Sequence, residues 1–190
     1  MPAIKLSDSH FRALGIFPLA FFIAQAVHYW RIDQMGHMFW MCNIGNLLLA
    51  IGLFLNHALL VRIAVIWLVP GLVIWLIYVV LPWGLFLSST VIHLGGLVVG
   101  LIAIRRVRMD RRAWAYAFVW YLGVQLLSRF ATATELNVNL SHGIAPGWQQ
   151  VFDAYWKFWL IGTAITAVGL WIIGLGFHKL WPAARESKTS

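Results

Sequence analysis

Two polar groups interrupt otherwise apolar stretches of this sequence and are the residues best suited to do chemistry. The first lies in residues 41–46 (MCNIGN) and includes Cys42, the only cysteine of the chain. The second is His93, which ends residues 88–93 (SSTVIH) about fifty positions later. A histidine can accept the proton of a thiol, and the resulting thiolate is a strong nucleophile. We therefore interpret Cys42 and His93 as a candidate nucleophile and base on two different helices.

The composition predicts the elements that position these residues. Of the 190 residues, 62% are hydrophobic and only 11% are charged, whereas soluble domains are about one quarter charged. Apolar runs long enough to cross a bilayer recur along the chain. We expect an all-α polytopic membrane protein, a single integral domain over residues 1–190, with a tight turn at 81–84. The six predicted spans are residues 11–30, 36–55, 59–80, 85–104, 113–133 and 154–176.

The distribution of positive charge predicts the orientation. The formal net charge is +8, and eleven of the fourteen Lys and Arg residues fall on the side that holds both termini, including the basic loop 105–112. Under the positive-inside rule both termini are cytoplasmic, in the inner (plasma) membrane. The basic loop then contacts anionic head groups. We expect membrane lipids as partners and no nucleic acid; the oligomeric state stays open.

The polar residues of the spans gather in the outer leaflet. By helical rise, Cys42 lies roughly 9 Å and His93 roughly 12 Å below the outer ends of their spans. Such groups usually face a bundle interior or a cavity, although hydrogen bonding between packed helices is the alternative. We predict that Cys42 and His93 line one cavity open toward the outer leaflet. At similar depth lie Gln25, His28, Asn43, Asn46, Ser89, Thr90, Gln125, Ser128 and Arg129.

The longest loop, residues 134–152, follows the fifth predicted span on the same side. Long loops in compact proteins often act as lids or binding loops. Asn137, Asn139 and His142 provide hydrogen-bonding groups there. We therefore predict that residues 135–148 fold back over the cavity.

The histidines offer a second chemistry. His28, His37 and His142 fall on the outer side with His93, and imidazole and thiolate are good zinc or copper ligands. We expect no cofactor, because no pair shows the i, i+4 spacing of a helical zinc motif. A zinc, copper or haem site remains the alternative.

The order of these motifs is similar to that of the YwaF-type bacterial integral membrane proteins. The shared features are Cys-Asn-x-x-Asn opening the second span, a histidine within the fourth, and Asn-x-Asn-Leu before the sixth. That group looks distantly related to the androgen-dependent TFPI-regulating protein family and its acyltransferase relatives. There a Thr or Cys nucleophile and a His from two helices act on lipid esters. The resemblance implies Cys42 as nucleophile and His93 as base.

These observations predict a membrane-embedded acyl hydrolase or acyltransferase that acts on a lipid ester from the outer leaflet. Acyl transfer needs donors for the oxyanion, and Asn43, Asn46 or Gln25 can serve. The other candidate substrate-binding residues are His28, Gln125, Arg129, Asn137 and Asn139. The metal- or haem-binding protein, a small transporter and a purely structural protein remain the alternatives.

Overall fold

The computed structural model describes residues 6–80 and 86–183. Its helices are α1 (Asp8–Ala13), α2 (Ile16–Arg31), α3 (Met41–Phe54), α4 (Ala58–Val80), α5 (Leu87–Thr90), α6 (Gly96–Val107), α7 (Ala113–Ala131) and α8 (Tyr155–Leu180). The shorter helices are η1 (Met35–Phe39), η2 (Val91–Gly95), η3 (Thr134–Leu136) and η4 (Val138–Leu140). No strand forms in this part of the chain, so the all-helical prediction is confirmed. The turn predicted at 81–84 lies outside the described residues.

Several helices have the length and composition of membrane spans. Within the described residues, four stretches qualify: Asp8–Arg31, Ala58–Ile77, Leu87–Val107 and Tyr155–Leu180. Helix α3 is apolar but shorter, with 14 residues. Helix α7 occupies the place of the fifth predicted span and carries Gln125 and Arg129. The chain therefore has the character of a membrane protein.

The predicted spans differ from the observed helices in how they begin. The first span is divided at Leu14 and Gly15 into α1 and α2, with Pro18 in the first turn of α2, where its missing N–H is not needed. The second span begins as the 3₁₀-helix η1, so regular α3 starts only at Met41. The fourth span is not a regular α-helix, because the π-helix η2 separates α5 from α6.

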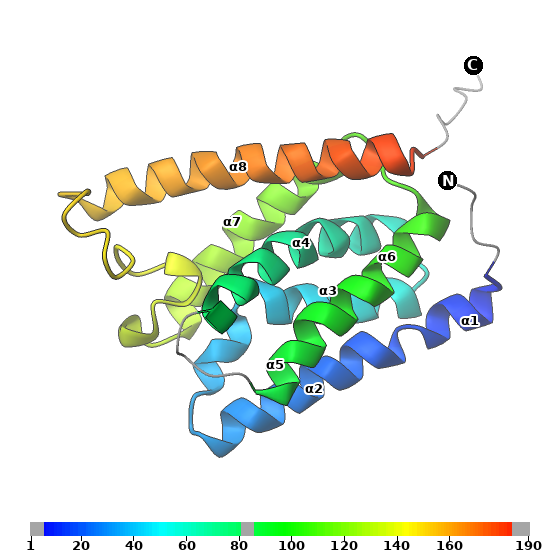
Figure 1. The fold of residues 1–190 in the computed structure, drawn as a ribbon, viewed down its shortest axis with the longest axis horizontal. Coiled ribbons are helices and arrows are strands. Elements are labelled where there is room, and N and C mark those ends of the chain that lie inside the picture. The colour runs from blue at the N-terminus through cyan, green and yellow to red at the C-terminus, as the bar shows by residue number, and fades with distance from the viewer. Residues whose placement is uncertain (1–5, 81–85, 184–190) are drawn as a thin grey trace.

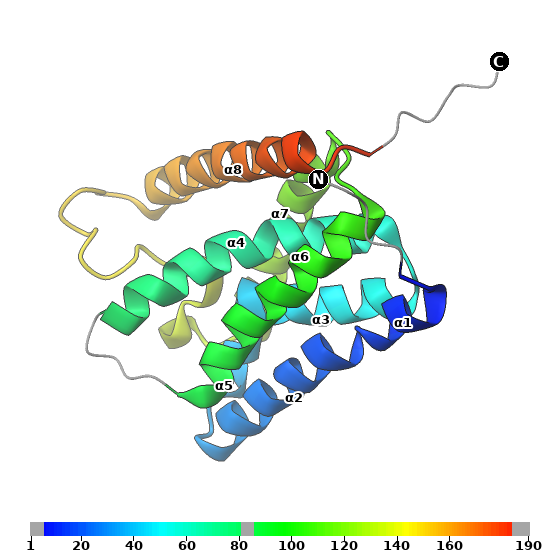
Figure 2. The same cartoon turned by 45° about the vertical axis from the view of Figure 1, so that its right-hand side comes forward.

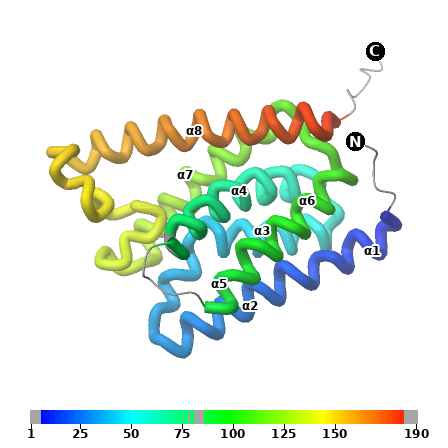
Figure 3. Tube along the Cα trace, viewed as in Figure 1, coloured from blue at the N-terminus to red at the C-terminus, as the bar shows by residue number. Residues whose placement is uncertain are grey.

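Helix α4 occupies the centre of the bundle and packs on α3, α6 and α7 (Figures 1 and 2). Its first half is buried on all sides at Val61 and from Ile63 to Leu68, as expected for a helix that is apolar all round. Helix α2 covers one side of the bundle and α8 the opposite side, as the trace in Figure 3 shows. The second half of α4 exposes Val73, Ile74 and Ile77.

Both described termini lie at one end of the bundle (Figure 1), and the loop between α6 and α7 is held firmly there. Arg62 of α4 donates to the carbonyls of Val107 at 3.0 Å and Arg108 at 2.7 Å, which satisfies the C-terminus of α6. The Met109 N–H donates to the Trp181 carbonyl at 2.7 Å, joining this loop to the residues after α8. We call the opposite end, where α2 and α7 finish and α3 and α8 begin, the distal end.

Candidate functional site

Cys42 and His93 approach one another at Gly71, near the distal end of the bundle. A Cβ added to Gly71 would stand 3.2 Å from the Cys42 Cβ and 3.9 Å from the His93 Cδ2. The Cys42 Cβ and the His93 Cδ2 therefore lie within about 7 Å of each other. Glycine allows this approach because it carries no side chain between the helices. Helices α3, α4 and η2 thus bring together the two residues that the sequence separates.

The His93 ring is held in a defined tautomer. Its Nδ1 lies 2.7 Å from the carbonyl oxygen of Ser89. Because a carbonyl can only accept, Nδ1 donates, and in the neutral ring Nε2 then carries the lone pair. The ring stacks on Trp75 with centroids 5.6 Å apart and planes 17° apart. His93 belongs to the π-helix η2, a rare distortion that is common at functional sites.

The Cys42 thiol lies beside the side chain of its neighbour Asn43. The Cys42 Sγ donates to Asn43 Oδ1 at 3.8 Å, a long bond typical of a weak donor. Asn43 in turn donates from Nδ2 to the His37 carbonyl at 2.9 Å and is almost fully buried. In this arrangement Asn43 ties η1 to the first turn of α3, and it presents its acceptor to the thiol.

Asn46 links the cysteine helix to the histidine helix. It is completely buried, and its Nδ2 donates to the carbonyls of Cys42 at 2.9 Å and Ile92 at 3.1 Å. Both amide hydrogens are therefore engaged. Its Oδ1 is buried without a partner among the described residues and would stand 2.2 Å from a Cβ on Gly96. Asn46 therefore packs directly against Gly96 of α6.

Helix α2 closes the other side of this polar group. Phe21 packs against Gly95 of η2, where an added Cβ would stand 2.7 Å from its ring. One turn later Gln25 is 2% exposed, and its Oε1 is buried with no partner in the described part of the chain. At the end of α2, His28 stacks on Phe86 with ring centroids 4.4 Å apart. Gln25 is therefore a buried polar side chain on a helix that packs against both α3 and η2.

A second polar cluster forms around Asn139. Its Oδ1 accepts from the Met41 N–H at 2.9 Å, and its Nδ2 donates to the Phe39 carbonyl at 2.7 Å and to Ser128 Oγ at 2.8 Å. Asn139 has a φ of 53°, a left-handed conformation that asparagine tolerates. The loop after α7 thus folds against η1 and the start of α3, one residue before Cys42.

The remaining predicted site residues belong to this second cluster. Gln125 donates to the Asn139 carbonyl at 3.1 Å and accepts from Trp159 Nε1 at 2.8 Å. Arg129 donates to the Ser141 carbonyl at 2.7 Å. Asn137 accepts from two backbone N–H groups at the turn after residue 141. The polar residues of the distal end are therefore divided between two groups, which meet where Asn139 bonds Met41.

The histidines considered as metal ligands have separate surroundings. His37 accepts from Trp40 Nε1 at 2.9 Å, whereas His142 Nε2 lies 3.3 Å from Thr132 Oγ1. His28 stacks on Phe86 and His93 on Trp75. Among residues 6–80 and 86–183, no three His, Cys, Asp or Glu side chains gather in one place.

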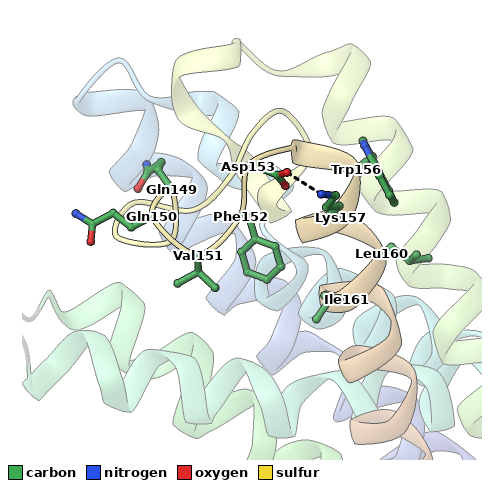
Figure 4. A pocket seen from close by; sticks show the side chains of 9 residues that line it. All are labelled: Gln149, Gln150, Val151, Phe152, Asp153, Trp156, Lys157, Leu160 and Ile161. Atoms are coloured by element: carbon green, nitrogen blue, oxygen red, sulfur yellow. Dashed lines mark hydrogen bonds and ion pairs between the residues drawn. The ribbon is translucent and has the colours of Figure 1, made fainter.

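Two hollows lie on the α8 side of the distal end. The larger, about 570 Å³, is formed by residues 149–161 alone (Figure 4). Asp153 and Lys157 form an ion pair there at 2.7 Å, and the hydrogen bond from Lys157 lowers the pKa of Asp153. The smaller hollow, about 350 Å³, lies between α7 and α8 and is lined by Leu122, Gln125, Leu126, Arg129, Ser141, Tyr155 and Trp159. Neither is lined by Cys42 or His93, so the predicted cavity at that pair stays a prediction.

Sequence reasoning missed several residues of these sites. Gly71, which follows Pro70 inside α4, marks the meeting point of Cys42 and His93. Trp75, one turn further along α4, supplies the stacking surface for His93. Tyr155 and Trp159 cross from α8 to the second cluster. In the sequence, Tyr155 and Trp159 are marked only as aromatic residues that carry a polar atom and lie near the start of a predicted helix.

Comparisons of the chain with protein-family models, with curated proteins and with solved structures found no match.

Proposed function

We propose that this protein is a membrane-embedded acyl hydrolase or acyltransferase in which Cys42 is the nucleophile and His93 the base. The observation that carries the proposal is the approach of the two side chains at Gly71, with His93 Nδ1 already bonded to the Ser89 carbonyl. That bond leaves Nε2 as the atom that accepts a proton. The resemblance of the motif order to YwaF-type proteins and their acyltransferase relatives agrees with this assignment.

The chemistry follows from these groups. His93 Nε2 takes the proton of the Cys42 thiol, and the thiolate attacks the carbonyl carbon of a lipid ester. The Ser89 carbonyl orients the ring and stabilises the imidazolium, as a carboxylate does in a serine protease. The imidazolium then protonates the leaving alkoxide as the ester C–O bond breaks, and an acyl thioester remains on Cys42. Water or a second hydroxyl releases the acyl group and regenerates the thiol.

Two of the predicted oxyanion donors already hold backbone carbonyls. The Asn46 amide hydrogens are both bonded to carbonyls, and Asn43 holds the His37 carbonyl. A role for either in catalysis would require these bonds to break. Among the predicted donors we propose Gln25, because it is a buried amide whose hydrogens, unlike those of Asn43 and Asn46, bond no carbonyl in the described part of the chain.

We further propose six spans, with both termini cytoplasmic. Helices α3 and α7 supply the two spans beyond the four that qualify by length and composition. Helix α3 is only about 21 Å long by its helical rise, shorter than the 30 Å hydrocarbon core. The 3₁₀-helix η1 precedes it, and Asn139 bonds both the Met41 N–H at the start of α3 and the Phe39 carbonyl just before it. The distal end then faces the outer leaflet, where the lipid ester enters.

The reactivity of Cys42 tests the proposal directly. Because it is the only cysteine, a lipophilic maleimide reports on this thiol alone in the purified full-length protein. We expect labelling to slow at least tenfold in His93→Ala, since one pKa unit of thiol activation corresponds to a tenfold change in thiolate. His57→Ala, at the opposite end of the bundle, is the matched control. Cys42→Ser and Cys42→Ala should lose turnover of a fluorogenic acyl ester in mixed micelles while they remain folded.

A different result would favour the alternatives. An inert thiol, together with a Cys42→Ala variant that loses thermal stability but no activity, would mean a structural cysteine. Metal analysis and an absorption spectrum of the purified protein would then separate a zinc, copper or haem protein from a transporter or a packing role.

A further inference from the structure

The hollow between α7 and α8 has a polar mouth and an apolar interior. Arg129, Ser141 and Tyr155 lie at the mouth, where α7 ends and α8 begins. Leu126 and Leu122 line its deeper part, one and two turns from Arg129 along α7, respectively. The volume of about 350 Å³ is at the lower limit of small-molecule sites and suits part of an acyl chain.

The positive charge of Arg129 has no acidic partner in this part of the protein. Among the described residues two ion pairs form, Arg106 with Asp8 and Lys157 with Asp153. Arg129 instead donates from Nη1 to the Ser141 carbonyl at 2.7 Å and lies 5.8 Å from the centre of the Tyr155 ring. A guanidinium has five N–H donors in a fork that matches phosphate oxygens. The fork therefore retains donors for an anion at the mouth of the hollow.

The α7 surface that forms the open side of the hollow and continues beside it is apolar and accessible from the side. On α7, Leu126 is 58% exposed, Leu127 50% and Phe130 81%. In a membrane such a surface faces lipid chains, so an occupant can enter from the bilayer without opening the bundle. Charge at the mouth and apolar walls below it match an amphiphile with an anionic head.

We propose that the α7–α8 hollow binds one anionic phospholipid, with its phosphate on the Arg129 guanidinium and part of an acyl chain against Leu122 and Leu126. Gln125 and Trp159, which bond across the hollow at 2.8 Å, position the two helices for this ligand. The site is separate from Cys42 and His93, and the proposal does not depend on their chemistry.

Thermal unfolding of the full-length protein in neutral detergent tests this site. Phosphatidylglycerol should raise the unfolding temperature in a saturable way, whereas phosphatidylcholine should not. Arg129→Gln should weaken the apparent affinity for phosphatidylglycerol at least about tenfold, because a hydrogen bond to a charged group is lost. Arg31→Gln, an exposed arginine at the end of α2, is the matched control and should keep the wild-type affinity.

A second pair of variants tests the apolar part without changing charge. Leu126→Trp fills the hollow and should abolish stabilisation by phosphatidylglycerol. Leu127→Trp, at a similarly exposed position outside the hollow, should leave it unchanged. Equal stabilisation by phosphatidylcholine would overturn the proposal, as would equal loss in Arg31→Gln or Leu127→Trp. Full protection by soluble glycerol phosphate would also overturn it, since it would indicate a phosphate site with no role for the acyl chain.

Discussion

Asn139 and Met41 are 98 positions apart in the chain and are joined by a 2.9 Å hydrogen bond from the Met41 N–H to Asn139 Oδ1. The first N–H groups of a helix have no partner within the helix. Trp40, which precedes α3, makes no capping bond with its own side chain. The loop after α7 therefore caps the helix that carries Cys42, and it fixes where that helix begins.

Replacement of Asn139 by alanine should destabilise the protein by about 2–4 kcal/mol. The change leaves the Met41 N–H and the Phe39 carbonyl without their partner, and each buried unpaired group is costly. The Ser128 hydroxyl loses one partner but keeps its bond to the Val124 carbonyl. Reversible unfolding in mixed micelles measures the free energy of unfolding. Asn139→Gly tolerates the left-handed backbone and is the control for strain. An alanine variant as stable as the wild type would show that the cap is unimportant.

Gly96→Ala should disrupt the link between α3 and η2. The new Cβ would stand 2.2 Å from Asn46 Oδ1, so Asn46 has to move and its bonds to the Cys42 and Ile92 carbonyls weaken. A loss of about 2–3 kcal/mol is the expected cost of overpacking. Gly123→Ala, where nothing lies within 4 Å, should be neutral or slightly stabilising because alanine favours the helix. Equal unfolding temperatures for the two variants would contradict this packing.

Gly71→Ala should affect reactivity more than stability. The added methyl group would stand 3.2 Å from the Cys42 Cβ and 3.9 Å from the His93 Cδ2, so it separates the proposed nucleophile from its base. We expect maleimide labelling of Cys42 to slow at least severalfold, with a loss of stability of about 1 kcal/mol. Gly162→Ala, where nothing lies within 4 Å of the added Cβ, is the control. An unchanged labelling rate in Gly71→Ala would show that the reactivity of the Cys42 thiol does not depend on its approach to His93.

Arg62→Met should loosen the end of the bundle that holds the termini. Arg62 donates to the Val107 and Arg108 carbonyls at the C-terminus of α6, where a positive charge also favours the helix dipole. Loss of both bonds should cost about 1–3 kcal/mol. Hydrogen exchange of the amides in residues 105–110 measures the local effect. Arg111→Met, at an exposed position, should leave this exchange unchanged, and faster exchange only in that control would contradict the assignment.

The proposed orientation predicts which loops are accessible from each side. In a Cys42→Ala background, a cysteine introduced in place of Arg111 should not react with a membrane-impermeant maleimide in intact cells. It should react once the cells are permeabilised and the reagent reaches the cytoplasmic face. A cysteine at Gln150, on the distal loop and exposed, should react from outside in intact cells. The opposite pattern would reverse the topology.

The composition and the apolar periodicity were enough to predict an all-helical protein with helices of membrane-span length. These properties are local, because each helix forms all its backbone hydrogen bonds within one segment of chain. The same reasoning placed the start of α4 and of α7 within one residue of where they lie. It could not predict the π-helix η2 around His93, since that distortion depends on packing partners from α2, α3 and α4.

The sequence by itself determined which residues are polar and near which end of each helix they lie, and so it selected Cys42, His93 and the distal polar residues. Only the tertiary structure decided which of them meet. Gly71 brings Cys42 to His93, whereas Asn139 draws Gln125 and the loop after α7 to the start of α3. The physical reason is that helix faces are matched by small residues and by hydrogen bonds between segments far apart in the chain. No local pattern records those pairings.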